Sequence, residues 1–125
     1  MATGKRGIRK PLGEVPGYRF IFARAQFEPI MVYSAPDNAH RMQNHYTIRY
    51  LNGRDSDDFT WGYYGTGPHA TAYSILMEMF GERIAEERMD DFVDLYVSKL
   101  DPKKGFRTDS FEVSGLLSIG WRAPK

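Results

Sequence analysis

The spacing of apolar and polar positions changes near residue 60, from the alternation typical of strands to the spacing typical of helices. In residues 18–24, Tyr18, Phe20 and Phe22 fall on one face of an extended chain. This alternation predicts a half-buried strand with those aromatic side chains on its buried face.

Two further strands are expected before that change. Residues 27–33 predict a second strand, and Pro29 confines its start to an edge or a bend. Residues 46–51 alternate β-branched and aromatic side chains and predict a third strand. Residues 59–61 fit a short returning strand that leads into a glycine-rich turn.

The segment after this turn is apolar almost all round. Within residues 70–80 the polar positions are Thr71, Ser74 and Glu78, and at helical spacing they form one narrow stripe. A helix of this kind has to be covered on most of its circumference. We therefore expect it to be the central core element.

The ends of this helix are marked by residues with special backbone preferences. Pro68 suits the first helical turn, where its missing N–H is not needed. Thr66 or Gly67 is the expected N-cap, and Gly81 suits the position just past the C-terminal end.

Residues 83–100 predict a second, amphipathic helix. Acidic residues crowd its first turns and Lys99 lies in its last, as the helix dipole favours. Asp101 and Pro102 are expected to end it. Its apolar positions fall on one face: Ala85, Met89, Phe92, Val93, Tyr96 and Leu100.

The C-terminal stretch carries two conflicting signals. Asp109 and Glu112 have the spacing of a capping box, which favours a short helix. Two glycines and several β-branched residues favour a strand instead. We expect the helix, because its apolar positions follow helical spacing: Val113, Leu116, Leu117, Gly120 and Trp121.

Strands followed by helices, without regular alternation, predict an α+β fold. We expect a single domain over residues 17–125, in which a small antiparallel sheet packs against two consecutive helices. Residues 1–16 are rich in glycine and proline and are expected to form a flexible basic arm.

Composition narrows the class of protein. The chain of 125 residues contains no cysteine, which excludes disulfides, thiolate metal sites and a cysteine nucleophile. No segment has the roughly 18 apolar residues of a membrane helix, and the N-terminus lacks the apolar run of a signal peptide. We expect a soluble cytoplasmic protein with no membrane contact. The eight tyrosines suit either an interaction surface or, more commonly, a tyrosine-rich core.

The net charge of +1 conceals two charged segments. A basic arm can contact nucleic acid or an acidic partner, although a basic terminal segment is more often simply a solvated tail. We expect nucleic acid binding, if any, through this arm alone: Lys5, Arg6, Arg9 and Lys10. The second helix carries a candidate protein-contact face of six acids, which equally fits a solvated surface: Glu82, Glu86, Glu87, Asp90, Asp91 and Asp94.

The turn of residues 62–68 is the sharpest candidate for ligand chemistry. Free backbone N–H groups at a helix N-terminus suit a phosphate or a carboxylate, and neighbouring aromatic rings suit a base. The alternative is that the glycines let the aromatic residues pack beneath the helix. The candidate ligand-binding residues are Trp61, Gly62, Tyr63, Tyr64, Gly65, Thr66, Gly67 and His69.

No catalytic, metal or cofactor site is predicted. His40, His45 and His69 lack the spacing of metal ligands, and residues 55–58 resemble a calcium loop in composition alone. Ser74 falls mid-helix and no nucleophile elbow is present. We therefore lean towards a protein that is not an enzyme.

The string Phe-Thr-Trp-Gly-Tyr-Tyr-Gly-Thr-Gly-Pro at residues 59–68 resembles the signature of a domain family of unknown function found in bacteria and bacteriophages. That signature has the form Phe-x-Trp-Gly-Tyr-Gly-Gly-Ser-Gly-Pro. The resemblance extends over roughly residues 59–113, where Phe92, Tyr96 and Leu100 follow the family's rhythm in the second helix. It implies a phage or mobile-element source, and the family has no established activity that could be carried over to this chain.

Two positions depart from the family pattern. Tyr64 replaces a glycine of the signature, and His69 stands where the family tends to have a small residue. If that glycine requires positive φ in the family, Tyr64 changes the turn.

Three hypotheses of function follow. The first is a small non-enzymatic binding protein, encoded by a phage or mobile element, that inhibits a host or defence protein through protein contacts. The second is a binder or sponge for a nucleotide or another small anion at residues 62–68. The third is a homo-oligomeric structural component, in which aromatic strands pair between subunits.

Overall fold

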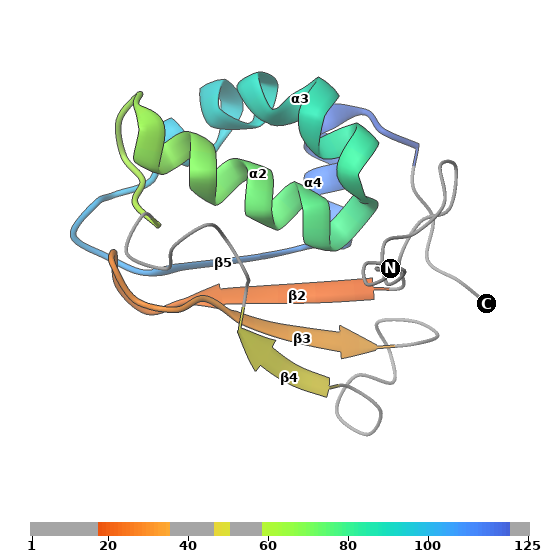
Figure 1. The fold of residues 1–125 in the computed structure, drawn as a ribbon, viewed down its shortest axis with the longest axis horizontal. Coiled ribbons are helices and arrows are strands. Elements are labelled where there is room, and N and C mark those ends of the chain that lie inside the picture. Colours follow the sequence, from red (N-terminus) through yellow and green to blue (C-terminus); the bar gives the residue numbers. More distant parts are fainter. Residues whose placement is uncertain (1–17, 36–46, 51–58, 121–125) are drawn as a thin grey trace, which may run out of the picture.

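The computed structural model describes residues 18–35, 47–50 and 59–120. The basic arm, residues 1–16, lies outside these ranges. Along the chain the elements are β2 (Tyr18–Ala23), β3 (Met31–Ala35), β4 (Thr47–Tyr50), α2 (Thr66–Phe80), α3 (Glu82–Leu95), the 3₁₀ helix η4 (Val97–Lys99), β5 (Phe106–Asp109) and α4 (Ser110–Leu117). Figure 1 shows the helices gathered on one side of the sheet. The predicted α+β class, with an antiparallel sheet and two consecutive helices, is confirmed.

The sheet has four strands in the order β4-β3-β2-β5, and each neighbouring pair is antiparallel. β2 is an inner strand, with Ile21 opposite Val32 of β3 and opposite Thr108 of β5. The strand β5 was not predicted, because its four residues lie between a turn and a helix cap. Residues 59–61, expected as a strand, form none. The second strand begins at Met31 rather than at residue 27.

The buried face of β2 differs from the prediction. Ile21 and Ala23 are fully buried, whereas Phe20 and Phe22 are half-buried on the opposite face. Tyr18 is nearly buried, but at the start of the strand. Both faces of this strand carry apolar residues, so alternation alone could not identify the face that meets the helices.

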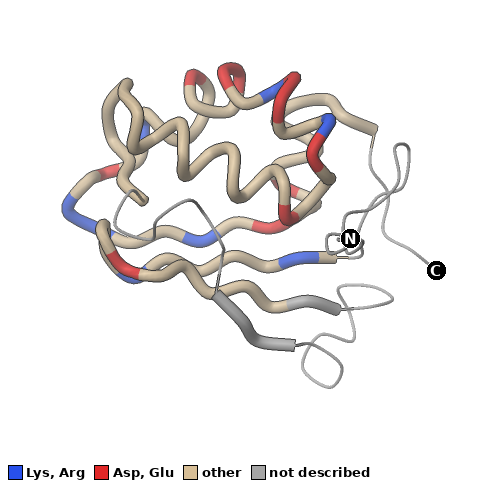
Figure 2. The backbone as a smooth tube through the Cα atoms, in the orientation of Figure 1, with Lys and Arg blue, Asp and Glu red and all other residues tan. Residues whose placement is uncertain are grey.

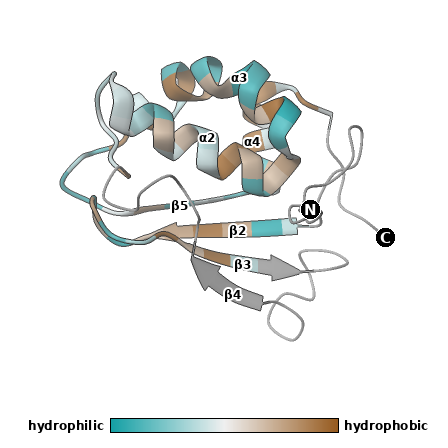
Figure 3. Cartoon of the chain, in the orientation of Figure 1, coloured by the Kyte–Doolittle hydropathy of each residue, from teal (hydrophilic) through white to brown (hydrophobic). Residues whose placement is uncertain are grey.

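Helix α2 is the central helix of the core, as expected. It packs against α3 on one side and β2 on the other (Figure 1). Figure 3 shows hydrophilic residues along much of α3 and apolar residues along α2. Ile75, Leu76 and Met79 are fully buried. Truncating one of them to alanine removes buried surface and leaves a cavity, at a cost of about 2–5 kcal/mol.

The second predicted helix ends one turn early. α3 stops at Leu95, and Tyr96 leaves the helical conformation with φ −137° and ψ −61°. The ring of Tyr96 stacks on Phe92 with 5.3 Å between centroids, and its hydroxyl donates to the carbonyl of Arg107 at 3.2 Å. The side chain of Tyr96 therefore joins the end of α3 to β5.

The C-terminal stretch forms a helix, as predicted. Asp109 caps α4, because its Oδ1 accepts the backbone N–H of Glu112 at 2.8 Å. The Glu112 carboxylate accepts the Thr108 hydroxyl at 2.7 Å. The last apolar position of the predicted pattern, Trp121, lies outside the described residues.

In the described residues, no helix is both long and apolar enough to span a lipid bilayer.

Candidate functional site

Trp61 anchors the loop that precedes α2. Its side chain is fully buried, and its indole N–H faces the carbonyls of Asp101 and Lys104 at 3.2 and 3.0 Å. Its backbone N–H donates to Gln26 Oε1 at 2.8 Å. Its ring meets Phe106 edge-on, with 4.9 Å between centroids. Since no face of the indole reaches solvent, Trp61 holds the loop in place and does not stack on a ligand in this structure.

Gly62 is required by both conformation and space. Its φ of 94° is one that side chains of L-residues rarely adopt. A Cβ built there lies 2.8 Å from the carbonyl oxygen of Leu100 and 2.8 Å from Cδ of Pro102. The Gly62 N–H donates to the carbonyl of Val97 at 3.0 Å. This residue therefore lets the loop lie directly against the segment that follows α3.

The N-cap of α2 is Gly65, not Thr66 or Gly67 as predicted. The carbonyl of Gly65 accepts the backbone N–H of His69 at 3.1 Å. Gly65 has no side chain to cap this end, and no acidic residue lies in the first turn. Thr66 is exposed and Gly67 is half-buried. The N-cap residue therefore supplies no side-chain acceptor to the backbone N–H groups of this turn, which the anion-binding hypothesis requires.

The two tyrosines of the loop lie at the surface. Tyr63 is 48% exposed and Tyr64 is 59% exposed. The hydroxyl of Tyr63 shares a 2.8 Å hydrogen bond with that of Thr60. The hydroxyl of Tyr64 donates to Asp94 on α3, and this hydrogen bond raises the pKa of the Tyr64 phenol. Tyr64 therefore holds its ring beside the acidic helix.

His69 makes a second connection to the acidic helix. Its Nδ1 lies 2.7 Å from the carbonyl of Gly65, and its Nε2 lies 3.2 Å from Oδ1 of Asp90. The imidazole is one-third exposed, and the Asp90 side chain is largely exposed. His69 thus links the first turn of α2 to the middle of α3.

The predicted acidic face is at the surface of α3 (Figure 2). Glu86, Glu87, Asp90, Asp91 and Asp94 are exposed, while Glu82 is half-buried in the first turn. Two of these acids pair within the helix. Arg88 Nε lies 3.0 Å from Asp91, and Arg83 lies 3.8 Å from Glu87. Such exposed pairs contribute about 0–1 kcal/mol each, so they shape the charge of the surface more than its stability.

The two candidate sites predicted from the sequence are therefore joined. The contacts of Tyr64 with Asp94 and of His69 with Asp90 bring the glycine-rich turn against the acidic helix. We call the combined area the acidic-aromatic surface, formed by Tyr64, His69, Asp90 and Asp94, with the exposed Tyr63 next to Tyr64 in the chain. Trp61 and Gly62 do not belong to this surface; they hold its loop against the segment that follows α3.

In residues 18–35, 47–50 and 59–120, no group of three or more histidine and acidic side chains is arranged to hold a metal ion. His40, His45 and residues 55–58 lie outside these ranges. Ser74 is buried in the middle of α2. The arrangement of exposed rings and carboxylates suits binding.

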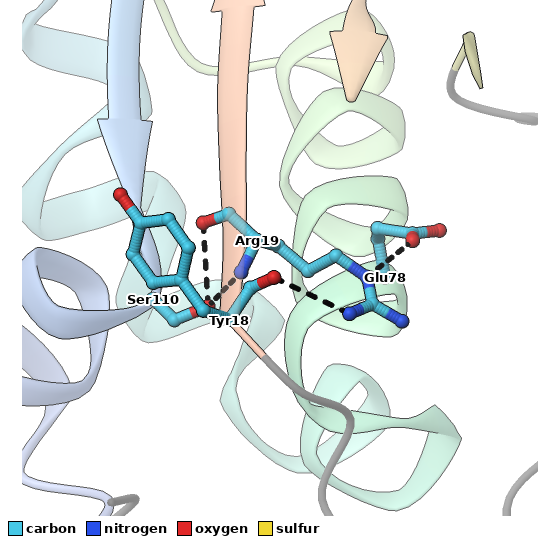
Figure 4. A network of polar contacts seen from close by, with 4 residues as sticks. All are labelled: Tyr18, Arg19, Glu78 and Ser110. Atoms are coloured by element: carbon cyan, nitrogen blue, oxygen red, sulfur yellow. Dashed lines mark hydrogen bonds and ion pairs between the residues drawn. The ribbon is translucent and has the colours of Figure 1, made fainter. Parts of the chain in front are cut away.

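A polar cluster that was not predicted joins β2 to α2 and α4 (Figure 4). Arg19 Nε donates to Glu78 Oε2 at 2.8 Å, and these side chains are 16% and 11% exposed. The Arg19 backbone N–H donates to the hydroxyl of Ser110 at 2.9 Å. At the same strand end, the Tyr18 hydroxyl donates to Asp109 at 3.0 Å. Burial and the charge on Asp109 together raise the pKa of Tyr18 strongly. Glu78 is the charged residue in the polar stripe of α2. A charge on an otherwise apolar helix is the signal in the sequence that could have indicated a basic partner on the sheet.

The helices packed on one side of the antiparallel sheet define a small α+β domain. The chain belongs to a family of unknown function, DUF6166, whose match covers residues 26–118. The predicted resemblance to a family of unknown function is confirmed at this level. Comparison with curated proteins and with solved structures gives no match.

Proposed function

We propose that this protein is a non-enzymatic binding protein that acts through protein contacts at the acidic-aromatic surface. The observation that carries the proposal is the 59% exposure of Tyr64, whose hydroxyl donates to Asp94 on α3 and which follows the 48% exposed Tyr63 in the chain. Tyrosine is enriched in binding hot spots, because its ring supplies apolar area and its hydroxyl supplies a hydrogen bond. The hydrogen bond to Asp94 holds Tyr64 in place before a partner arrives.

The partner is a protein with a basic surface. Carboxylates on successive turns of α3 attract lysine and arginine side chains, and the tyrosine rings accept cation–π contacts from them. An acidic helix of this kind imitates the charge of nucleic acid towards a nucleic-acid-binding protein. We further propose that the chain comes from a bacteriophage or mobile element, acts in the bacterial cytoplasm and inhibits a host or defence protein.

The test is affinity capture from bacterial lysate with matched variants. Tyr64→Ala and Asp90→Lys remove one ring and reverse one charge of the acidic-aromatic surface. Leu116→Ala removes an exposed apolar side chain on α4, which is 39% exposed, and serves as the control. A partner held through this surface binds at least about thirtyfold more weakly to Tyr64→Ala, the loss typical of a hot spot, and normally to the control. Equal capture by all variants would refute the proposal.

A small anion at the N-terminus of α2 is a second candidate, favoured because the N-cap residue, Gly65, supplies no side-chain cap. Native mass spectrometry of the gently purified protein distinguishes it. A small added mass that is lost in Gly67→Val supports the anion site. A protein partner or a homo-oligomer appears instead as a large added mass.

A further inference from the structure

A second surface lies where two turns meet at the end of the sheet. The first turn, residues 24–28, joins β2 to β3, and the second, residues 101–105, leads into β5. Gln26 Nε2 donates to the carbonyl of Pro102 at 3.1 Å. A Cβ on Gly105 would lie 2.1 Å from the carbonyl oxygen of Ala23, so the two backbones are in direct contact.

Phe27 occupies a strained conformation in the first of these turns. Its φ is 63°, in the left-handed region that a bulky residue rarely adopts. The backbone N–H of Phe27 donates to the carbonyl of Phe59 at 2.9 Å, which helps to hold it there. Its ring is nevertheless 61% exposed, so burial of the side chain does not offset the cost of this conformation. Strained residues that the surrounding structure holds in place are concentrated at functional sites.

The two turns around Phe27 carry three basic side chains and two acidic ones: Arg24, Lys103, Lys104, Glu28 and Asp101. Lys103 and Lys104 are exposed on the second turn, and neither has an ion-pair partner among the described residues. Arg24 is exposed and lies 3.3 Å from Glu28. The Asp101 carboxylate accepts the backbone N–H of Lys103 at 2.9 Å, within its own turn. We call this area the basic tip, formed by Arg24, Phe27, Lys103 and Lys104.

We propose that the basic tip binds single-stranded nucleic acid, with a base stacked on Phe27 and the neighbouring phosphates contacted by Lys103 and Lys104. An exposed ring beside flexible cations is the combination that binds single strands without sequence preference. A duplex fits less well, because its bases are already stacked and offer the ring no free face. An acidic peptide would use the lysines but would leave the ring without a stacking partner.

The assay is fluorescence anisotropy of the full chain with a labelled oligothymidylate of about 15 nucleotides, long enough for one small site. We expect binding at about 50 mM salt that weakens roughly tenfold by about 200 mM, since two or three phosphates are neutralised. A duplex of the same length should bind more weakly.

Two variants test the ring and the charge separately. Phe27→Asn removes the ring and substitutes a residue that tolerates the left-handed conformation. It should weaken binding at least about fivefold while the Tm stays the same or rises, because stacking is lost but strain is relieved. Lys103→Glu should weaken binding, whereas Arg83→Glu, which makes the same charge change on α3, should not. This dissociation between stability and affinity would not arise if Phe27 were merely structural.

Four outcomes would overturn the proposal. The first is the absence of binding at low salt, and the second is equal affinity of Phe27→Asn and the parent chain. The third is binding that is lost only when the basic residues of the N-terminal arm are replaced by serine: Lys5, Arg6, Arg9 and Lys10. The fourth is stronger binding of polyglutamate than of the oligonucleotide. The third would assign nucleic acid binding to the N-terminal arm. The fourth would assign an acidic protein partner to the tip.

Discussion

Replacing Gly62 by alanine should destabilise the domain more than the same replacement at Gly81. The two glycines have nearly the same φ, 94° and 95°. Their surroundings differ, because a Cβ on Gly62 lies 2.8 Å from the Leu100 carbonyl oxygen, whereas a Cβ on Gly81 meets no atom within 4 Å. The pair therefore separates the cost of the backbone conformation from the cost of the close contact.

The magnitudes follow from those two terms. Holding alanine at such a φ costs about 1–3 kcal/mol. The loss of flexibility in the unfolded chain returns about 0.4–1 kcal/mol of this at both sites. The close contact adds about 1–3 kcal/mol at Gly62, because the atoms it meets are a backbone oxygen and a proline ring rather than the end of a flexible side chain. We expect Gly62→Ala to be less stable than Gly81→Ala by about 1–3 kcal/mol.

Urea unfolding followed by circular dichroism measures this difference. The m-values of both variants should match that of the parent chain, so that the shift in midpoint reports stability alone. Equal stability of the two variants would refute the reasoning, since it would mean that the segment after α3 moves aside for a methyl group at no cost. It would then also be too loose to fix Trp61 beneath the acidic-aromatic surface.

Two further predictions concern buried polar groups. Arg19→Ala or Glu78→Ala alone should lower the free energy of unfolding by about 2–4 kcal/mol, because each leaves a nearly buried charge without this partner. Arg19→Met combined with Glu78→Leu should cost much less, because no charge is left behind. Urea midpoints of the three variants measure this, and a loss in the double variant as large as the two single losses together would contradict it. Burial raises the pKa of Tyr96 to about 12, and Glu112 adds to the shift. A phenol whose pKa is raised by folding stabilises the fold below its unfolded pKa near 10. This stabilisation is lost as the pH rises towards 12, so the difference in unfolding free energy between the parent chain and Tyr96→Phe should fall between about pH 10 and 12. Alkaline unfolding curves of both proteins measure it, and parallel curves would exclude this role.

The sequence predicted the elements whose signals are local. Helix α2 was recognisable because its polar positions form one narrow stripe, and α4 because Asp109 and Glu112 have capping-box spacing. The strand β5 was missed because four residues next to a helix cap carry little periodicity. Its pairing with β2 joins Phe20 to Asp109, and no local pattern specifies a partner that far along the chain.

The candidate site was predicted as two parts, and only the fold shows that they meet. Tyr64 and Asp94 are 30 residues apart, so their contact depends on how α3 packs against α2. For Trp61 the sequence leaves both ligand stacking and packing beneath the helix open, because an aromatic residue beside glycines suits either; the structure shows packing. The conformation of Phe27 was beyond prediction, because left-handed residues are expected at glycine or asparagine.

The strand order has a consequence for the way the protein is made. β2 is synthesised first among the described strands, but one of its two neighbours, β5, is synthesised after both long helices. Until residue 109 has left the ribosome, one edge of β2 has no strand beside it, and α2 has only part of its sheet to pack on. Strands that wait for a distant partner fold slowly and expose an edge to other chains. The sheet therefore closes only after both long helices have been synthesised.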